Sequence, residues 1–142
     1  MSVNIWTDGS CFGNPGPGAW AVVVRYASGK FESFCGFLPH TTNNRAELVA
    51  IREAFKAVDR QHPLIIFSDS EWCVNILNRV WRARENLDLI GDIRECAKGR
   101  SVRFYWIPRE ANFADSLARE MMQTGRLEYN TNASCLSQLL AK

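Results

Sequence analysis

The stretch that decides the fold is LIIFSDS, which runs from Leu64 to Ser70. Its four consecutive apolar residues, followed at once by polar ones, indicate a short strand that is buried on both faces. Helical periodicity precedes this strand over Asn43 to Asp59 and follows it from Glu71 to about Arg84. A strand between two helices is typical of crossover connections that cover both faces of a partly parallel sheet.

Further strands and helices extend this unit in both directions. The turn Ala27-Ser28-Gly29-Lys30 predicts a hairpin, and the Gly- and Pro-rich stretch from Cys11 to Gly18 predicts a loop. The expected strands are Val3–Asp8, Ala19–Tyr26, Phe31–Leu38, Leu64–Phe67 and Val102–Ile107, and the expected helices are Asn43–Asp59, Glu71–Arg84, Leu87–Lys98 and Asn112–Thr124. We therefore expect a mixed α/β (α+β) fold with a five-stranded sheet and helices on both faces. Strands one to three would be antiparallel, and strands four and five parallel to the first.

The length and charge of the chain limit its domain organisation and its partners. With 142 residues it predicts one domain over residues 1–125, followed by a tail over residues 126–142 with one weak amphipathic turn near Leu136. The formal net charge is only +2, which counts against nucleic-acid binding over a broad positively charged surface. It does not exclude a local strip of basic residues.

Cysteine usage and the apolar runs predict a compartment. The five cysteines are an odd number without close pairs, which indicates reduced thiols: Cys11, Cys35, Cys73, Cys96 and Cys135. The N-terminus lacks the pattern of a signal peptide, and no apolar run approaches the ~20 residues of a membrane span. We expect a soluble cytoplasmic monomer without a membrane partner.

Acidic residues occupy three positions that each have an ordinary structural explanation but that indicate a shared site when they are taken together. Glu47 lies within the apolar stripe of the helix Asn43–Asp59, although a first-turn Glu that reaches solvent is the open alternative. Asp69 closes the buried strand at its carboxyl end, where a plain helix N-cap is the alternative. Asp8 ends the first strand, where a turn Asp beside a glycine is the alternative. If the first and fourth strands are neighbours, the three carboxylates converge and favour a hard cation such as Mg²⁺ or Mn²⁺.

Four motifs in a fixed order contain these acids. They are TDGS (7–10) with GNPGPG (13–18), TTNNRAEL (41–48), SDS (68–70) and ADSLAR (114–119). Together they resemble the type 1 ribonuclease H family over roughly residues 3–124. The first two motifs are specific, and the last two carry weight only in combination.

The resemblance implies an activity and a set of site residues. It implies hydrolysis of the RNA strand of an RNA/DNA hybrid by two Mg²⁺ ions, with Mn²⁺ as a substitute, giving 5′-phosphate and 3′-hydroxyl ends. The implied metal-binding and catalytic carboxylates are Asp8, Glu47, Asp69 and Asp115. The implied substrate contacts are Cys11, Asn14, Thr42, Asn43, Asn44 and Glu71, with Thr42 near a DNA phosphate. Alternatives are a surface role for Asp115, an oxygen from Asn112 in its place, and a plain capping role for Asn43 or Asn44.

The chain departs from the family pattern in three places. Many members have a His in the loop before the fourth acid, whereas this loop has Arg109 and Glu110, which we expect to substitute only in part. A basic insertion present in longer relatives is absent, and only the segment Arg79–Arg84 offers basic and aromatic residues there. Glu71 stands where Gln is common. Two alternative functions therefore remain: a hybrid-binding module with damaged or weak catalysis, and a related nuclease acting on double-stranded RNA or DNA junctions.

Overall fold

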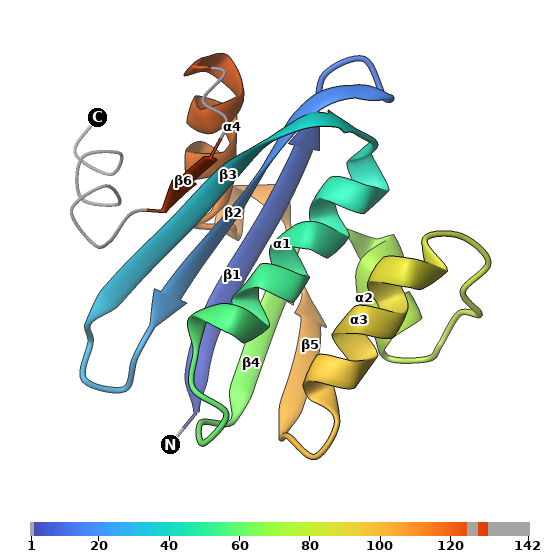
Figure 1. Cartoon of the computed structure of the whole chain (residues 1–142). Coiled ribbons are helices and arrows are strands. Elements are labelled where there is room, and N and C mark those ends of the chain that lie inside the picture. Colours follow the sequence, from blue (N-terminus) through green and yellow to red (C-terminus); the bar gives the residue numbers. More distant parts are fainter. Residues whose placement is uncertain (1, 125–127, 131–142) are drawn as a thin grey trace.

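One mixed sheet forms the centre of the protein, and the computed structural model describes residues 2–124 and 128–130 (Figure 1). The strand order is β5-β4-β1-β2-β3-β6. The strands are β1 (Val3–Cys11), β2 (Gly16–Arg25), β3 (Phe31–Thr41), β4 (Leu64–Ser68), β5 (Val102–Trp106) and β6 (Glu128–Asn130). β1, β2 and β3 are antiparallel neighbours, and β4 and β5 run parallel to β1, so the expected five-stranded arrangement is confirmed. β6, which falls within the expected tail, adds a sixth strand antiparallel to β3.

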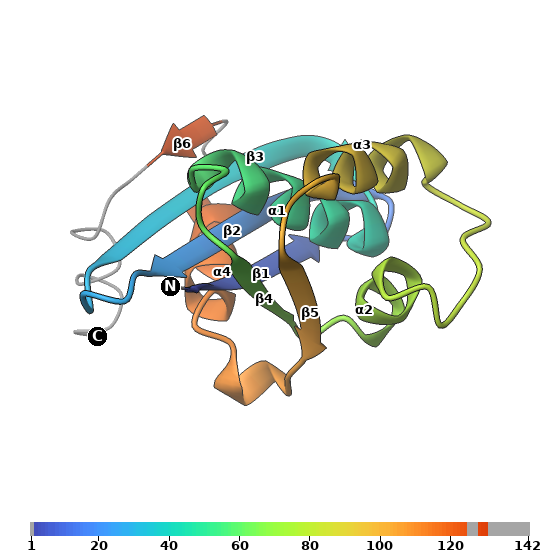
Figure 2. The ribbon, with the colours of Figure 1, turned by 90° about the horizontal axis from the view of Figure 1, so that it is seen from below.

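Helices cover both faces of this sheet, as expected. The helices are α1 (Asn43–Ala57), α2 (Glu71–Leu77), α3 (Leu87–Ala97) and α4 (Asp115–Thr124), with a short 3-10 turn over Arg109–Ala111. α1 and α3 lie side by side on one face, and α4 lies on the other, against β1, β2 and β3 (Figures 1 and 2). Each face has its own apolar layer, the larger one under α1 and the smaller one under α4. β4 therefore lies between the two cores, with Leu64 and Ile66 in the larger one and Phe67 against the smaller one.

The bounds of several elements differ from the expected ones. β1 continues to Cys11 because that residue pairs with Gly18 of β2, so the loop expected over Cys11–Gly18 shrinks to residues 12–15. α2 ends at Leu77 and not near Arg84, since Arg79 has a backbone φ of 60°, which ends a right-handed helix. Asn112 precedes α4 and does not belong to it, because its side chain accepts the N–H of Ala114.

The remaining sequence predictions meet the structure in part. Over residues 2–124 and 128–130, no helix combines the length and the apolar character that a membrane crossing needs. The cysteines Cys11, Cys73 and Cys96 are free thiols, as expected. Cys135 and the amphipathic turn near Leu136 lie outside the described residues.

Candidate active site

Three carboxylates meet at the carboxyl end of the central strands. Asp8 lies in β1, Asp69 directly follows β4, and Asp115 is the first residue of α4. β1 and β4 are parallel neighbours with Thr7 opposite Ser68, so the next residue of each chain segment, an aspartate, falls at the same edge of the sheet. Each aspartate offers one oxygen, and the three oxygens lie within 4.8 Å of one another. The structure thus brings together three of the four predicted acids.

Glu47, the fourth predicted acid, lies beside this group. The N–H of Gly9 donates a 2.7 Å hydrogen bond to Glu47 Oε1, which connects α1 to β1 next to Asp8. Only a glycine allows this approach, because a Cβ on Gly9 would lie 2.2 Å from the carbonyl carbon of Ala46. Burial raises the pKa of the Glu47 carboxyl well above its usual value, and the charges of Asp8 and Asp69 raise it further.

The electrostatics of this group fit a divalent cation. Burial raises the pKa of Asp8 from 3.8 to about 8, and repulsion from Asp69 and Asp115 adds to the shift. The Arg109 guanidinium opposes that shift, and Arg119 forms an ion pair with Asp115. Oxygen is the one donor type in the cluster, and carboxylate oxygens are the ligands that Mg²⁺ and Mn²⁺ prefer.

The raised pKa of Asp8 predicts how stability depends on pH. In the unfolded chain Asp8 loses its proton near its ordinary pKa of 3.8, whereas in the folded chain it keeps the proton to about pH 8. The folded state therefore binds more protons between these values, and this group lowers the free energy of unfolding as pH rises from about 4 to about 8. In EDTA, we expect thermal unfolding at a lower temperature at pH 8.5 than at pH 6.

Mg²⁺ should restore the stability that the folded protein loses at high pH, since it binds the ionised carboxylates of the folded state. The measurement is the Mg²⁺-induced rise in unfolding temperature at both pH values, and it should be larger at pH 8.5. An equal rise at pH 6 and pH 8.5 would contradict a metal site that requires an ionised Asp8.

Asn112 connects the segments that contain the three aspartates. Its buried side-chain amide donates to the carbonyl of Thr7 at 2.9 Å and to Asp69 Oδ2 at 3.1 Å. Its oxygen accepts the N–H of Ala114 at 3.1 Å, directly before Asp115. The side chain therefore turns its nitrogen toward Asp69 and uses its oxygen to hold the start of α4.

A groove with amide side chains adjoins the carboxylates. One cavity of about 610 Å³ is lined by Asn14, Thr42, Asn43, Asn44, Glu85 and Asn86. The carboxylate cavity, of about 330 Å³, is lined by Asp8, Gly9, Ser10, Cys11, Asn43, Arg109, Asp115 and Arg119. Asn43 belongs to both linings, so the groove and the carboxylates form one continuous surface. Five of the six predicted substrate contacts lie on it, and Glu71, an exposed residue that begins α2, lines neither cavity.

The start of α1 leaves two of these amides available. Thr42 is the N-cap, and its hydroxyl accepts the N–H of Arg45 at 3.2 Å. Asn14, from the loop between β1 and β2, accepts the N–H of Asn43 at 2.9 Å. Within the described part of the chain, the side chains of Asn43 and Asn44 make no hydrogen bond. The expected alternative that one of them caps the helix is wrong, and both offer donors and acceptors to the groove.

Several residues that sequence reasoning missed hold this surface in place. Arg45 forms a two-pronged ion pair with Asp88, with N···O distances of 3.1 and 2.9 Å, and also donates to Asn86. The Arg45 guanidinium lowers the pKa of Asp88 to about 2. Trp106 Nε1 donates to the carbonyl of Asp69 at 3.1 Å. Among these contacts, only the Asp115–Arg119 ion pair could have been predicted from the sequence, since acidic and basic residues four apart on a helix attract one another.

The strand order, the oxygen-donor cluster and the adjoining amide-lined groove form a site of an α/β protein that is suited in its donor atoms to divalent-cation chemistry on a polar substrate. The family model described as RNase H matches residues 1–123. The chain is 35% identical to the ribonuclease H of Campylobacter jejuni over 131 residues, which cover 83% of this chain and 89% of the relative. It is 36% identical to the ribonuclease H of Symbiobacterium thermophilum over an alignment of 142 positions, which covers 87% of this chain and 96% of that one.

A solved structure agrees with these relatives. The structure of LC11-RNase H1 in complex with an RNA/DNA hybrid matches with a TM-score of 0.79 at 28% identity, covering 87% of this chain and 98% of that one. The chain therefore belongs to the ribonuclease H family, and the resemblance inferred from the motifs is confirmed.

Proposed function

We propose that this chain hydrolyses the RNA strand of RNA/DNA hybrids and leaves 5′-phosphate and 3′-hydroxyl ends. The observation that carries the proposal is the group of three aspartate oxygens within 4.8 Å, continuous with a groove lined by amides. Family membership and the hybrid bound to LC11-RNase H1 support the choice of substrate.

The carboxylates Asp8, Glu47, Asp69 and Asp115 would hold two Mg²⁺ ions, with Mn²⁺ as a substitute. When bound, such ions supply activation of the attacking water and charge stabilisation at the leaving 3′ oxygen. Asp8 and Asp69 are fixed by neighbouring strands, and Asn112 orients the Asp69 carboxylate. The chain's own part in the reaction is therefore to hold these oxygens together against their repulsion.

The groove would bind the hybrid by its shape. A hybrid near A-form exposes 2′-hydroxyls in a wide minor groove, and the free amides of Asn43 and Asn44 match such donors and acceptors. Asn14, Thr42 and Cys11 would complete the contact, with Thr42 near a DNA phosphate. Glu71, away from both cavities, would make an outer contact and weaken affinity through its charge.

Arg109 would take over part of the role of the absent loop His. It lines the carboxylate cavity and its charge favours the ionised form of Asp8, so it is placed to meet a phosphate or release a product. Glu110 lines neither cavity and is the weaker candidate.

The test is a cleavage assay on end-labelled RNA/DNA hybrid, double-stranded RNA, duplex DNA and a DNA junction, each with Mg²⁺, Mn²⁺ or EDTA. Metal-dependent cutting of the RNA strand of the hybrid alone supports the proposal. Cutting of double-stranded RNA or of the junction would support the related nuclease instead. Binding of the hybrid without cutting under any metal would support the alternative of a non-catalytic hybrid-binding module.

Replacing Asp115 with alanine should lower hybrid cleavage about a hundredfold, because it removes one of the three clustered oxygens. Glu120→Ala, on the same helix, is the control and should keep near-full activity. Near-full activity of Asp115→Ala would remove Asp115 from the proposed metal ligands; the Asn112 oxygen, which accepts the N–H of Ala114, is not placed to replace it. Initial rates at saturating Mg²⁺ and at limiting Mg²⁺ separate loss of metal binding from loss of turnover.

We also propose that the protein acts as a cytoplasmic monomer. The free thiols of Cys11, Cys73 and Cys96 suit a reducing compartment. Sedimentation of the purified chain measures the oligomeric state, and a dimer mass would overturn that part of the proposal.

A further inference from the structure

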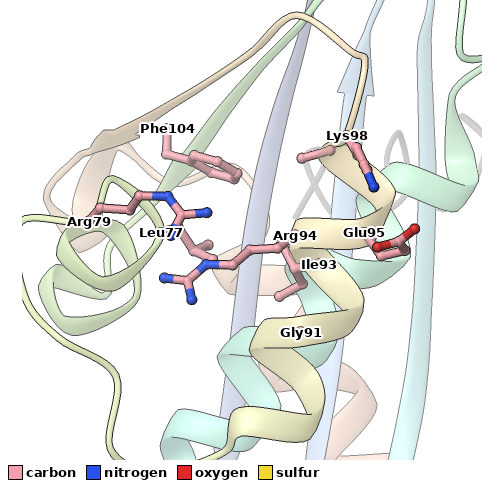
Figure 3. Close-up of a pocket in the computed structure, with 9 residues that line it drawn as sticks. Leu77, Arg79, Gly91, Ile93, Arg94, Glu95, Lys98 and Phe104 are labelled. Atoms are coloured by element: carbon pink, nitrogen blue, oxygen red, sulfur yellow. The ribbon is translucent and has the colours of Figure 1, made fainter.

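A third groove lies between α2, α3 and β5, on the face of the sheet that α1 and α3 cover (Figure 3). Its volume is about 500 Å³, within the ~300–1,000 Å³ range of small-molecule sites. It shares no lining residue with the carboxylate cavity or the amide-lined groove. An occupant of this groove would therefore bind apart from the proposed catalytic carboxylates.

Two arginines give this groove an unbalanced positive charge. The side chains of Arg79 and Arg94 extend toward the same space beside Leu77 (Figure 3). Arg94 donates to the carbonyl of Ile76 at 3.2 Å, and its Nε atom is buried without a hydrogen-bond partner. Across the residues that the structure describes, neither arginine has an ion pair. Like charges directed to one space attract an anion, and guanidinium groups suit a phosphate in particular.

The rest of the lining indicates what the anion is attached to. Phe104 of β5, Leu77 and Ile93 contribute apolar surface beside the arginines. A free phosphate would leave this surface in water, whereas a flat ring against Phe104 would cover it. Lys98 and Glu95 lie on the α3 side of the groove, and the Glu95 carboxylate opposes a second phosphate there.

We propose that this groove binds a nucleotide, with a single phosphate between Arg79 and Arg94 and the base against Phe104. The nucleotide can be a free mononucleotide or the unpaired end of a nucleic-acid strand, since both present the same phosphate and base. The inference does not rest on the proposed cleavage activity, because its residues are separate from the carboxylates and it requires no metal.

The test is calorimetric titration of the full chain in EDTA, which removes divalent cations from the carboxylates. The probes are adenosine 5′-monophosphate, adenosine, inorganic phosphate and a 5′-phosphorylated pentathymidylate. We expect saturable binding of the monophosphate with a Kd on the order of 0.1–1 mM, and at least about tenfold weaker binding of adenosine and of phosphate.

Substitutions of Arg79 and Arg94, which line the groove, and of Arg103, which does not, give matched variants. Arg79→Gln should weaken nucleotide binding at least about fivefold, and Arg94→Lys, which keeps the charge but loses the planar fork, should also weaken it. Arg103 precedes Phe104 in β5, is exposed and points to the opposite face of the sheet. Arg103→Gln therefore removes the same charge outside the groove and should change nucleotide affinity less than about twofold.

The outcomes separate the two sources of the nucleotide. Binding of the mononucleotide supports a free ligand, and binding of the pentathymidylate alone supports a strand end. No saturable binding of either probe would overturn the inference. So would an equal effect of Arg79→Gln and Arg103→Gln, since it would mean diffuse attraction to positive charge. None of these results depends on whether the chain cleaves a hybrid.

Discussion

Asp69→Asn is expected to reduce hybrid cleavage at least about a thousandfold while it leaves hybrid affinity within about threefold of the original. Asparagine keeps the size of the side chain and an oxygen that can accept from Asn112 Nδ2. It removes a full negative charge from a group of three oxygens within 4.8 Å, which weakens the attraction for a divalent cation. The groove amides at Asn43 and Asn44 are untouched, so binding should persist.

The measurement pairs single-turnover cleavage with a binding titration on the same hybrid. Asp92→Asn is the matched control, because it makes the same chemical change at an exposed position of α3 and should alter neither quantity by more than about twofold. Loss of hybrid binding in Asp69→Asn would assign Asp69 to substrate contact. Retained cleavage would remove Asp69 from the proposed metal ligands.

Gly9→Ala is expected to cost about 3 kcal/mol or more in the free energy of unfolding and to lower cleavage with it. The new Cβ would lie 2.2 Å from the carbonyl carbon of Ala46 and 2.3 Å from the nitrogen of Glu47, and both are backbone atoms of α1. A flexible side chain could rotate away, but a helix backbone cannot. α1 must therefore withdraw from β1, which also breaks the 2.7 Å bond from Gly9 to Glu47.

Thermal and urea unfolding measure this cost, and Gly91→Ala is the control. Gly91 lies in α3 with nothing within 4 Å of the added Cβ, so alanine should stabilise the protein by about 0.5–1 kcal/mol. The same change should thus have opposite signs at the two glycines. Unchanged stability in Gly9→Ala would mean that the contact between β1 and α1 is looser than the structure has it.

The positions of Asp8 and Asp69 were predictable because they depend on local pattern. A buried strand with a polar end places Asp69 at the edge of the sheet, whatever the details of the surrounding loops. Pairing with a parallel neighbour then determines Asp8 as well. Glu47 was predictable for a different reason, since an acid on an apolar helical stripe is costly unless something in the fold uses it.

Other features depend on contacts that a linear pattern does not contain. Arg45 and Asp88 are 43 residues apart, and neither local sequence predicts that they form an ion pair. The orientation of the Asn112 amide follows from three separate partners, so only the folded arrangement decides which atom faces Asp69. α2 ends early because Arg79 adopts a left-handed backbone conformation, which helix propensity in that segment does not reveal.

The capping of α1 has a consequence for the entropy of binding. Thr42 and Asn14 satisfy the first N–H groups of the helix, and Arg45 fastens its first turn to Asp88. The backbone beneath Asn43 and Asn44 is thus ordered before any ligand arrives, and only the two short side chains lose freedom on contact. The protein should therefore lose little conformational entropy when a duplex binds there. Desolvation and charge should then limit the affinity of the duplex.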